Sequence, residues 1–453
     1  MACTSSTIDA KSPLRLARRC LTWSGVSRMR RMSSIRAGRL AGVCVLSSAG
    51  RRIDSRNRSP TFPPVIYLDA NATTPVDPAV LEAMLPFLRE HYANPAASYA
   101  AGRRVRRAME HARGQLAALL GASPGEITFT SGGTESINAA HASVRALWPE
   151  KPELIITGTE HAAVLESAAR WQAQGGKVVT APVHPDGRVD IEALRTLVRP
   201  GITALVSIMW ANNETGVIAP MHEIVTLAHA AGALVHTDAV QAVGKIHLDV
   251  HTTPVDFLSL SGHKMHAPKG IGALYVSQRV RFAPLLVGGG QENERRSGTE
   301  NVPGVIALGK AAELARQHLE NGTKSKIKAL RDRFEHLVHA ALSQLRIHGC
   351  PTHRLGTTSS FCLPEIDAAG MLILLDQAGI ACSAGSACHT GALHGSHVLE
   401  AMSISARDAE CTLRFSFSRF NTKAEIETAA HAVIESAHKM REAQGSEFAV
   451  ITH

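Results

Sequence analysis

The hydrophobic positions of the chain from Val65 onward fall in short β-branched runs separated by amphipathic stretches. Stretches 164–172 and 191–197 have the apolar spacing of helices, whereas the runs between them are short and favour strands. Strands that alternate with helices in this way predict a parallel sheet covered by helices. The predicted strands of this sheet cover residues 127–129, 154–157, 177–181, 204–210, 234–237, 257–260 and 273–276.

A different pattern covers the last third of the chain. A long polar–apolar helical pattern extends over residues 310–345, and further strand runs follow at 358–363 and 412–418. Helical stretches at 366–377 and 423–441 accompany these strands. We expect this part of the chain to form a second, smaller α+β domain.

The first 64 residues differ from the rest in composition. Residues 1–60 contain twelve arginines and one lysine against two aspartates, a net charge of +11, so the remainder of this +9 chain carries −2. We expect this basic leader to be disordered or removed, as a mitochondrial transit peptide or as an over-extended reading frame. Its basicity gives no support for nucleic-acid binding by the folded body. No apolar run is long enough to predict a transmembrane helix.

The eight cysteines suggest neither disulfides nor a metal site. Three of them lie in the leader, and the others form no C-x-x-C pair, so we expect reduced thiols and a cytosol-like compartment. Cys388 is unusual because its neighbours in SAGSACHTGALHG (383–395) are glycine, alanine, serine and histidine. A structural cysteine normally has apolar neighbours. Cys382 and Cys411 are predicted to be such structural cysteines.

Three motifs that follow predicted strands carry candidate chemistry. SGGTES (131–136) can offer N–H groups and a hydroxyl to a phosphate at a helix N-terminus. VHTDAVQAVGK (235–245) places Asp238 at the carboxyl edge of the sheet, where ligands bind. SLSGHKMHAPKG (259–270) contains Lys264, a candidate Schiff-base lysine. Each motif alone also has an ordinary structural interpretation, respectively a glycine turn, a helix N-cap aspartate and a surface lysine.

Together the three motifs meet the needs of pyridoxal phosphate (PLP): donors for its phosphate, a carboxylate for its ring nitrogen and an amine for its aldehyde. The chain resembles the class I cysteine desulfurases of the NifS/IscS type, in the aminotransferase fold-type I superfamily. The resemblance extends from about Val65 to about Ile434. It rests on the ordered motifs YLDANATTP, NPAASYAAG, TSGGTES, TEHAAVLE, MWANNETG, HTDAVQAVGK, SGHKMHAPKGIGALYV, GGGQENERRSGTEN, GSACHTG and LRFSFSRFNT.

The resemblance implies an α/β fold-type I PLP enzyme. Its large domain would hold a mainly parallel seven-stranded sheet covered by helices, and its smaller C-terminal α+β domain would hold the cysteine loop. The implied layout is a basic leader at 1–64, a segment joining the small domain at 65–80, the large PLP-binding domain at 81–320, the small domain at 321–445 and a tail at 446–453.

The resemblance also assigns roles to residues. Lys264 would carry the cofactor and move protons, Asp238 would pair with its ring nitrogen, and His161 would stack on the ring. Arg414, helped by Asn71, would bind the substrate carboxylate. The remaining implied ligands are Gly133, Thr134, Ser261 and His263 for the phosphate, Gln241 and Asn213 for the phenolate side, and Thr299 for the phosphate held by the partner subunit of a homodimer. Without the other motifs, His161 would be interpreted as an ordinary core histidine and Arg414 as a strand residue that faces solvent.

The implied reaction converts L-cysteine to L-alanine. Cys388, as a thiolate, would attack the substrate sulfur and become a persulfide for an acceptor protein such as an iron–sulfur scaffold. No metal ligand is implied, although Cys388 could touch an iron–sulfur cluster during transfer. His389 stands directly after Cys388, where relatives commonly have threonine, and this departure is specific to the chain.

Two other activities remain alternatives at this point. A selenocysteine lyase uses the same apparatus, although Ala162 stands where that branch is expected to carry an acid. A PLP aminotransferase would have no use for the Cys388 segment.

The expected partners are L-cysteine, a sulfur acceptor and a second copy of the chain, with neither nucleic acid nor membrane. The expected location is the cytoplasm, or the mitochondrion if the leader is a transit peptide.

Overall fold

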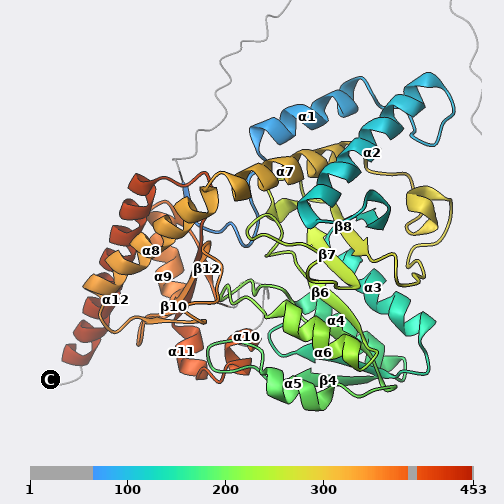
Figure 1. The fold of residues 1–453 in the computed structure, drawn as a ribbon. Helices are drawn as coiled ribbons and strands as arrows, with labels where there is room; N and C mark the ends of the chain where they lie inside the picture. The colour runs from blue at the N-terminus through green and yellow to red at the C-terminus, as the bar shows by residue number, and fades with distance from the viewer. Residues whose placement is uncertain (1–64, 386–394, 451–453) are drawn as a thin grey trace, which may run out of the picture. The chain divides into compact units, whose positions relative to one another are not determined.

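A seven-stranded sheet forms the centre of the computed structural model, which describes residues 65–385 and 395–450 (Figure 1). Its strands are β2 (Ile127–Thr130), β3 (Glu153–Thr157), β4 (Lys177–Ala181), β5 (Thr203–Ser207), β6 (Leu234–Asp238), β7 (Phe257–Ser261) and β8 (Gly272–Val276). Their order is β2-β8-β7-β6-β5-β3-β4. Only β8 runs antiparallel to its neighbours. The seven predicted strands and the mainly parallel sheet are confirmed.

The structure corrects one strand boundary. The hydrophobic pattern predicted a strand over 204–210, but β5 ends at Ser207. Residues 208–210 remain buried beyond the strand, and the N–H of Trp210 donates to the carbonyl of Asp238 at 2.9 Å. The apolar run is therefore longer than the strand because the segment that leaves the sheet still packs in the core.

Helices cover both faces of this sheet, as the alternating pattern predicted. Leu258 on β7 faces the core shared with α2 and α7, whereas its neighbour Phe257 faces the core shared with α3 and α4. The helices of this part are α1 (Pro78–Arg89), α2 (Ala100–Leu120), α3 (Gly133–Leu147), α4 (Ala162–Ala173), α5 (Ile191–Leu197), α6 (Met221–Ala230) and α7 (Val302–Glu320), with the 3-10 turns η1 (Pro124–Glu126), η2 (Gly262–Lys264) and η3 (Gln291–Glu294).

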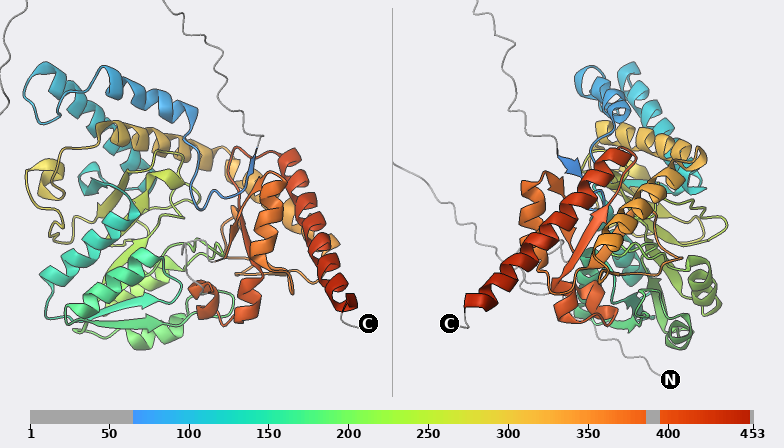
Figure 2. Two further views of the ribbon diagram at one scale, coloured as in Figure 1. Left: turned by 180° about the vertical axis from the view of Figure 1, so that it is seen from behind. Right: turned by 90° about the vertical axis from the view of Figure 1, so that its left-hand side faces the viewer.

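The C-terminal part packs around a smaller antiparallel sheet of order β12-β13-β10-β9. Phe334, Phe361, Phe415 and Phe417 form its aromatic core. Its strands are β9 (Arg346–Ile347), β10 (Thr358–Cys362), β12 (Ser383–Ala384) and β13 (Thr412–Ser416). Its helices are α8 (Thr323–Ala341), α9 (Ala368–Gln377), α10 (His397–Ala401), α11 (Ala406–Glu410) and α12 (Lys423–Val450). Figure 2 shows α8 and α12 on the side away from the central sheet.

The predicted helix over 310–345 is two helices rather than one. α7 ends at Glu320 and α8 begins at Thr323, with Gly322 between them at a φ of 83°. Glycine adopts this left-handed conformation at little cost, so the chain turns there. The helical pattern continued across the turn because both helices bury one apolar face.

The start of the described chain packs on the C-terminal part. β1 (Ile66–Tyr67) pairs in parallel with β11 (Ile380–Ala381), and Leu68 lies in the aromatic core.

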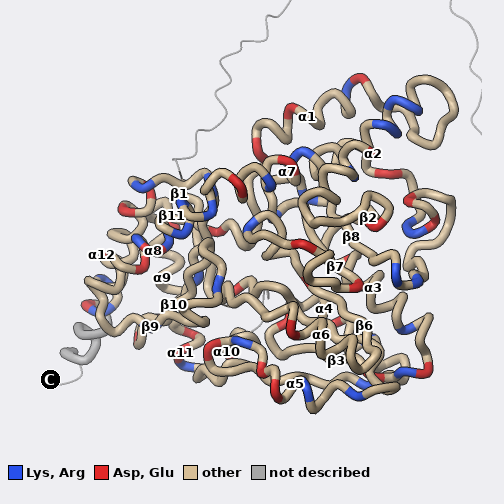
Figure 3. The backbone as a smooth tube through the Cα atoms, in the orientation of Figure 1, with Lys and Arg blue, Asp and Glu red and all other residues tan. Residues whose placement is uncertain are grey.

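Basic and acidic residues are interspersed along the described chain (Figure 3). Among the described residues, no helix is both long enough and apolar enough to cross a bilayer.

Candidate active site

Eleven of the predicted site residues line one cavity of about 550 Å³ at the carboxyl ends of β6 and β7. The carboxyl edge of a parallel sheet is where ligands bind in open α/β folds. The eleven are Asn71, Gly133, Thr134, His161, Asn213, Asp238, Gln241, Ser261, His263, Lys264 and Arg414. Residues from both ends of the sequence therefore meet in one hollow.

Asp238 ends β6 and is buried. Its Oδ1 accepts the N–H of Val240 at 2.9 Å. Burial raises the pKa of the Asp238 carboxyl, and the neighbouring His161 and Lys264 oppose that rise. A buried carboxylate gains stability from a cationic partner, and a protonated ring nitrogen would be such a partner.

The N-terminus of α3 opens into the same cavity through Gly133 and Thr134. No side chain caps this helix, and its first N–H groups have no partner within the helix. A Cβ at Gly133 would come within 2.8 Å of Val240 Cγ2, so glycine allows the helix to start close to the turn after β6. The N–H groups, with the hydroxyls of Thr134 and Ser261, make a donor set that fits a phosphate.

Lys264 lies in η2, directly after β7. Its Nζ donates to the backbone carbonyls of Asn71 and Ala72, each at 2.6 Å. The neighbouring His263 lines the cavity, and its Nδ1 lies 3.1 Å from Thr73 Oγ1. Burial, with Lys264 and Lys269, lowers the pKa of His263 to about 4, so its ring is neutral at pH 7.

His161 caps α4. Its Nδ1 accepts the N–H of Ala163 at 3.1 Å, so the proton of the neutral ring belongs on Nε2. The cap fixes the ring at the wall of the cavity. This placement allows the ring to face a bound cofactor and to exchange a proton at Nε2.

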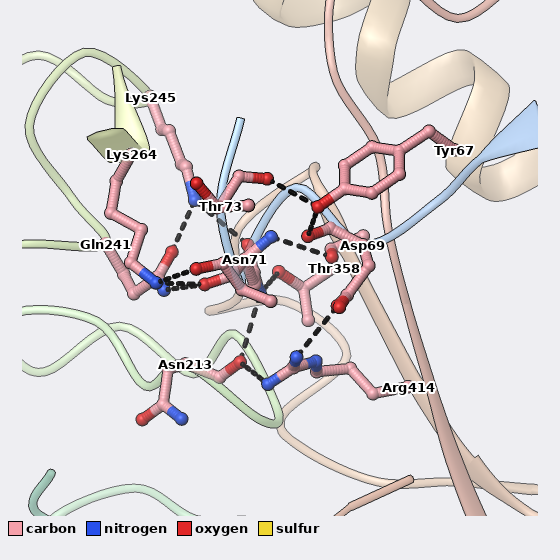
Figure 4. Close-up of polar contacts among 12 residues, drawn as sticks. Tyr67, Asp69, Asn71, Thr73, Asn213, Gln241, Lys245, Lys264, Thr358 and Arg414 are labelled. Atoms are coloured by element: carbon pink, nitrogen blue, oxygen red, sulfur yellow. Dashed lines mark hydrogen bonds and ion pairs between the residues drawn. The ribbon is translucent and has the colours of Figure 1, made fainter. Parts of the chain in front are cut away.

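Arg414 comes from β13 and is buried. Its Nη2 donates to Asp69 Oδ1 at 2.9 Å and its Nη1 donates to the carbonyl of Asn213 at 3.2 Å (Figure 4). The Asn71 amide donates to the same carbonyl at 3.0 Å. Arg414 thus brings a buried cation to the wall of the cavity, while its Nε is buried with no hydrogen-bond partner among the described residues.

Two predicted residues are not placed in this cavity. Thr299 lines a neighbouring cavity of about 160 Å³, together with Arg296 and Asn301, and Ser131 and Gly270 line both cavities. Cys388 lies outside the described residues, as does His389.

Of the described cysteines, Cys382 lies closest in sequence to Cys388. Burial, with the negative charge of Asp69, raises the pKa of Cys382 to about 12. Cys411 is buried, as predicted for a packing residue. Within residues 65–385 and 395–450, no cluster of histidine, cysteine and acidic side chains has the arrangement of a metal site.

Three polar residues of the site were missed by the sequence interpretation. Asp69 pairs with Arg414, Glu160 is buried next to His161, and Lys245 bonds to Gln241. All three stand inside motifs that were singled out, namely YLDANATTP, TEHAAVLE and HTDAVQAVGK. The sequence motifs therefore contained these three residues, but the long-range contacts that make them part of the site could not be predicted from the sequence.

The chain matches known proteins over nearly all of the described residues. The family model for aminotransferase class-V matches residues 66–428. A protein named cysteine desulfurase 2 from Trichormus variabilis is 51% identical over 363 residues, 80% of this chain and 90% of its own length. A cysteine desulfurase from Gluconacetobacter diazotrophicus is 47% identical over 380 residues, 83% of this chain and 94% of its own.

Solved structures agree with these matches. A NifS-like protein superimposes with a TM-score of 0.77 at 37% identity, covering 82% of this chain and 98% of its own. SspA, solved in complex with cysteine, superimposes with a TM-score of 0.69 at 31% identity, covering 79% of this chain and 99% of its own. The chain therefore belongs to the aminotransferase class-V family and, within it, to the cysteine desulfurases of the NifS type.

Proposed function

We propose that this protein converts L-cysteine to L-alanine and passes the sulfur, as a persulfide on Cys388, to an acceptor protein. Family membership makes it a PLP-dependent sulfurtransferase. The observation that carries the proposal is the meeting of Lys264, Asp238 and Arg414 in one cavity. These residues supply an amine, a buried carboxylate and a buried cation, which are the groups that PLP and an amino-acid carboxylate require.

PLP, when bound, supplies an aldehyde for an amine and a ring that stabilises negative charge on the substrate Cα. Asp238 would hold the proton on the ring nitrogen, because a buried carboxylate favours a cation beside it. The α3 N-terminus, Thr134 and Ser261 would bind the phosphate. Lys264 Nζ would hold the cofactor and, once the substrate amine has replaced it and set the lysine amine free, would carry the Cα proton.

The substrate carboxylate would bind at Arg414. The partners on Nη1 and Nη2 fix the guanidinium at the wall of the cavity, where its positive charge would attract the carboxylate. Charge-assisted bonds from a guanidinium to a carboxylate are stronger and more directional than neutral ones. SspA, solved in complex with cysteine, is 31% identical to this chain and supports the choice of substrate.

The sulfur step would use Cys388 as a thiolate, the nucleophilic form of cysteine. Its sulfur would form a bond to the substrate sulfur while the substrate Cβ–S bond breaks. The electron pair of that bond would remain on the carbon fragment, which takes up protons and leaves as alanine. The acceptor protein would then remove the outer sulfur of the persulfide.

The test compares a Cys388→Ser variant with the wild type. We expect the variant to bind PLP with unchanged visible absorbance and to lose persulfide and alanine formation, since only the nucleophile is removed. A Cys382→Ser variant is the matched control, because the raised pKa of that thiol keeps it protonated. It should retain activity. Persulfide mass shifts and alanine release measure both outcomes.

Sulfide release from cysteine by Cys388→Ser at the wild-type rate would reject Cys388 as the nucleophile. Faster turnover of selenocysteine than of cysteine would favour a selenocysteine lyase, and keto-acid-dependent turnover would favour an aminotransferase. The same assays therefore separate the three activities.

We further propose a homodimer that works in the cytoplasm with an iron–sulfur scaffold as the sulfur acceptor. The dimer rests on Thr299, which resembles a residue that reaches the partner subunit's phosphate. Mitochondrial location is the alternative if residues 1–64 are a transit peptide, and the N-terminal mass of the mature protein distinguishes the two.

A further inference from the structure

Lys245 makes two hydrogen bonds inside the site that none of the proposed roles uses. Its Nζ donates to Gln241 Oε1 at 2.5 Å and to Asn71 Oδ1 at 2.9 Å (Figure 4). The lysine stands four residues after Gln241, and Asn71 comes from the other end of the chain. One ammonium thus joins two amides of the cavity wall.

These bonds determine which way the two amides point. A lysine ammonium has only donors, so it accepts only the oxygen side of a neighbouring amide. With both oxygens held, the NH₂ of Asn71 donates to the carbonyl of Asn213 at 3.0 Å and to Thr358 Oγ1 at 2.9 Å. The NH₂ of Gln241 donates to the carbonyl of Asn71 at 3.0 Å.

The reversed amides would not suit the site. A flipped Gln241 would bring its NH₂ against the Lys245 ammonium and direct its oxygen toward the Asn71 carbonyl. It would then offer an acceptor where an anionic phenolate oxygen needs a donor. The orientation of Gln241 as a donor therefore depends on a positive or hydrogen-donating group at position 245.

We propose that Lys245 is a positioning residue, which holds the oxygens of the Gln241 and Asn71 amides. Asn71 is thereby fixed on Asn213 and Thr358, and Gln241 keeps one N–H beyond its bond to the Asn71 carbonyl for the PLP phenolate. This inference rests on the proposed function, because that function assigns Gln241 to the PLP phenolate and Asn71 to the substrate. Lys245 itself acts only through the two amides.

The hydrogen bonds from Lys245 to the two amides depend on pH. Burial, with the charges of Lys264 and Arg414, lowers the pKa of Lys245 to about 7. Its charge-assisted bonds are therefore complete below pH 7 and weaken as the pH rises through about 7, where a neutral amine with fewer donors remains. The charged or titratable residues that line one cavity with Lys245 are Lys264, His266, His318, Lys324 and Arg419, and Asp77 pairs with Arg419. On the other side of Lys264, the lining of the cofactor cavity includes Glu135, His161, Asp238, His263, Lys269 and Arg414.

The experiment measures PLP binding without cysteine, in full-length protein. We expect Lys245→Met to weaken PLP binding about ten- to hundredfold, because two charge-assisted bonds are lost. Lys245→Arg should stay within about fivefold of the wild type and lose the inflection near pH 7, since arginine keeps its charge. Lys328→Met, which removes an exposed lysine paired with Asp332, is the control and should change nothing.

Equilibrium dialysis and the pH dependence of the visible band give both readouts. A Lys245→Met protein that binds PLP within twofold of the wild type and keeps the pH 7 inflection would overturn the proposal. If Lys245→Met does not fold, Lys245→Arg decides, because an inflection that persists with arginine cannot come from position 245. If the wild type forms no alanine from cysteine, the proposed function fails, yet these binding data still report on Lys245.

Discussion

At the scale of single residues, two buried glutamates of the fold are held in opposite charge states. Burial raises the pKa of Glu160 to about 8, although Thr157 and the N–H of Met209 donate to it. Burial would also raise the pKa of Glu153, but hydrogen bonds from Arg199 and Thr203 outweigh it and lower that pKa. Glu160 is therefore protonated at pH 7 and Glu153 is ionised.

We predict opposite effects when each glutamate is replaced by glutamine. The folded pKa of Glu160 lies above the unfolded value of 4.5, so its contribution is complete below pH 4.5 and is lost as the pH rises toward 8. Glu160→Gln should flatten this decline, which amounts to at most about 1.4 kcal/mol per pH unit. Urea unfolding at pH 5, 6.5 and 8 measures the change.

Glu153→Gln is the matched comparison. Its carboxylate contributes stability above pH 4.5 that is lost on acidification, because its folded pKa is depressed. The glutamine variant should therefore be less stable than the wild type at pH 7, whereas Glu160→Gln should gain stability relative to the wild type between pH 5 and pH 7, because it has no carboxyl group to ionise. Equal losses for the two variants at pH 7 would contradict the assigned protonation of Glu160.

The sequence predicted the residues of the site better than their partners. Asp238 and Lys264 were found because they follow strands, and a strand end is visible as the end of a β-branched run. Lys245 and Asp69 were missed because their role depends on side chains from distant segments. Nothing in the local pattern around Lys245 indicates that it bonds to Asn71, 174 positions earlier.

At the scale of elements, the hydrophobic pattern predicted which strands and helices exist but not how each one is directed. All seven strands of the central sheet were found, yet the antiparallel direction of β8 has no local signal. The same pattern extended β5 by three residues and joined α7 to α8. Burial decides the pattern, whereas hydrogen bonding and Gly322 decide where the elements end.

The junction between α3 and the turn after β6 offers a test at this scale. We predict that Gly133→Ala weakens PLP binding about tenfold, because its Cβ would lie 2.8 Å from Val240 Cγ2 and displace the helix N-terminus. Shortening Val240 removes the clash, so the double variant Gly133→Ala/Val240→Ala should recover most of the affinity. Titration of apoprotein with PLP measures each step.

Gly114→Ala on α2 controls for the added methyl group, since no atom lies within 4 Å of a Cβ there. That variant should bind PLP normally and gain up to about 1 kcal/mol of helix stability. If the double variant binds PLP no better than Gly133→Ala alone, the clash with Val240 is not the cause, and the backbone of Gly133 itself would be the critical feature.

At the scale of the whole molecule, charge is distributed unevenly along the chain. Residues 1–60 carry +11 and the remaining residues −2, and the family match begins at residue 66. A sequence pI near 9.3 is therefore a property of a segment that lies outside the matched region. The net charge of the whole chain alone would suggest nucleic-acid binding. The part of the chain that matches the family carries no such excess of positive charge, so its charge does not indicate nucleic-acid binding.

The position of Thr299 leads to a prediction about the dimer. Thr299 lines a cavity that adjoins the one lined by Lys264, because Ser131 and Gly270 line both. In the proposed homodimer, Thr299 serves the phosphate site of the partner subunit. If so, a dimer of one Lys264→Ala subunit and one Thr299→Ala subunit contains one intact site. That site combines Lys264 of the second subunit with Thr299 of the first, while the other site lacks both residues.

Co-expression with two affinity tags isolates this mixed dimer. We expect it to bind one PLP per dimer with wild-type affinity and to form alanine at about half the wild-type rate. Thr299→Ala homodimers should bind PLP about tenfold more weakly, since one phosphate hydrogen bond is lost. If Thr299 instead served its own subunit, every site of the mixed dimer would be defective, so the absence of a wild-type-affinity site would exclude a shared active site.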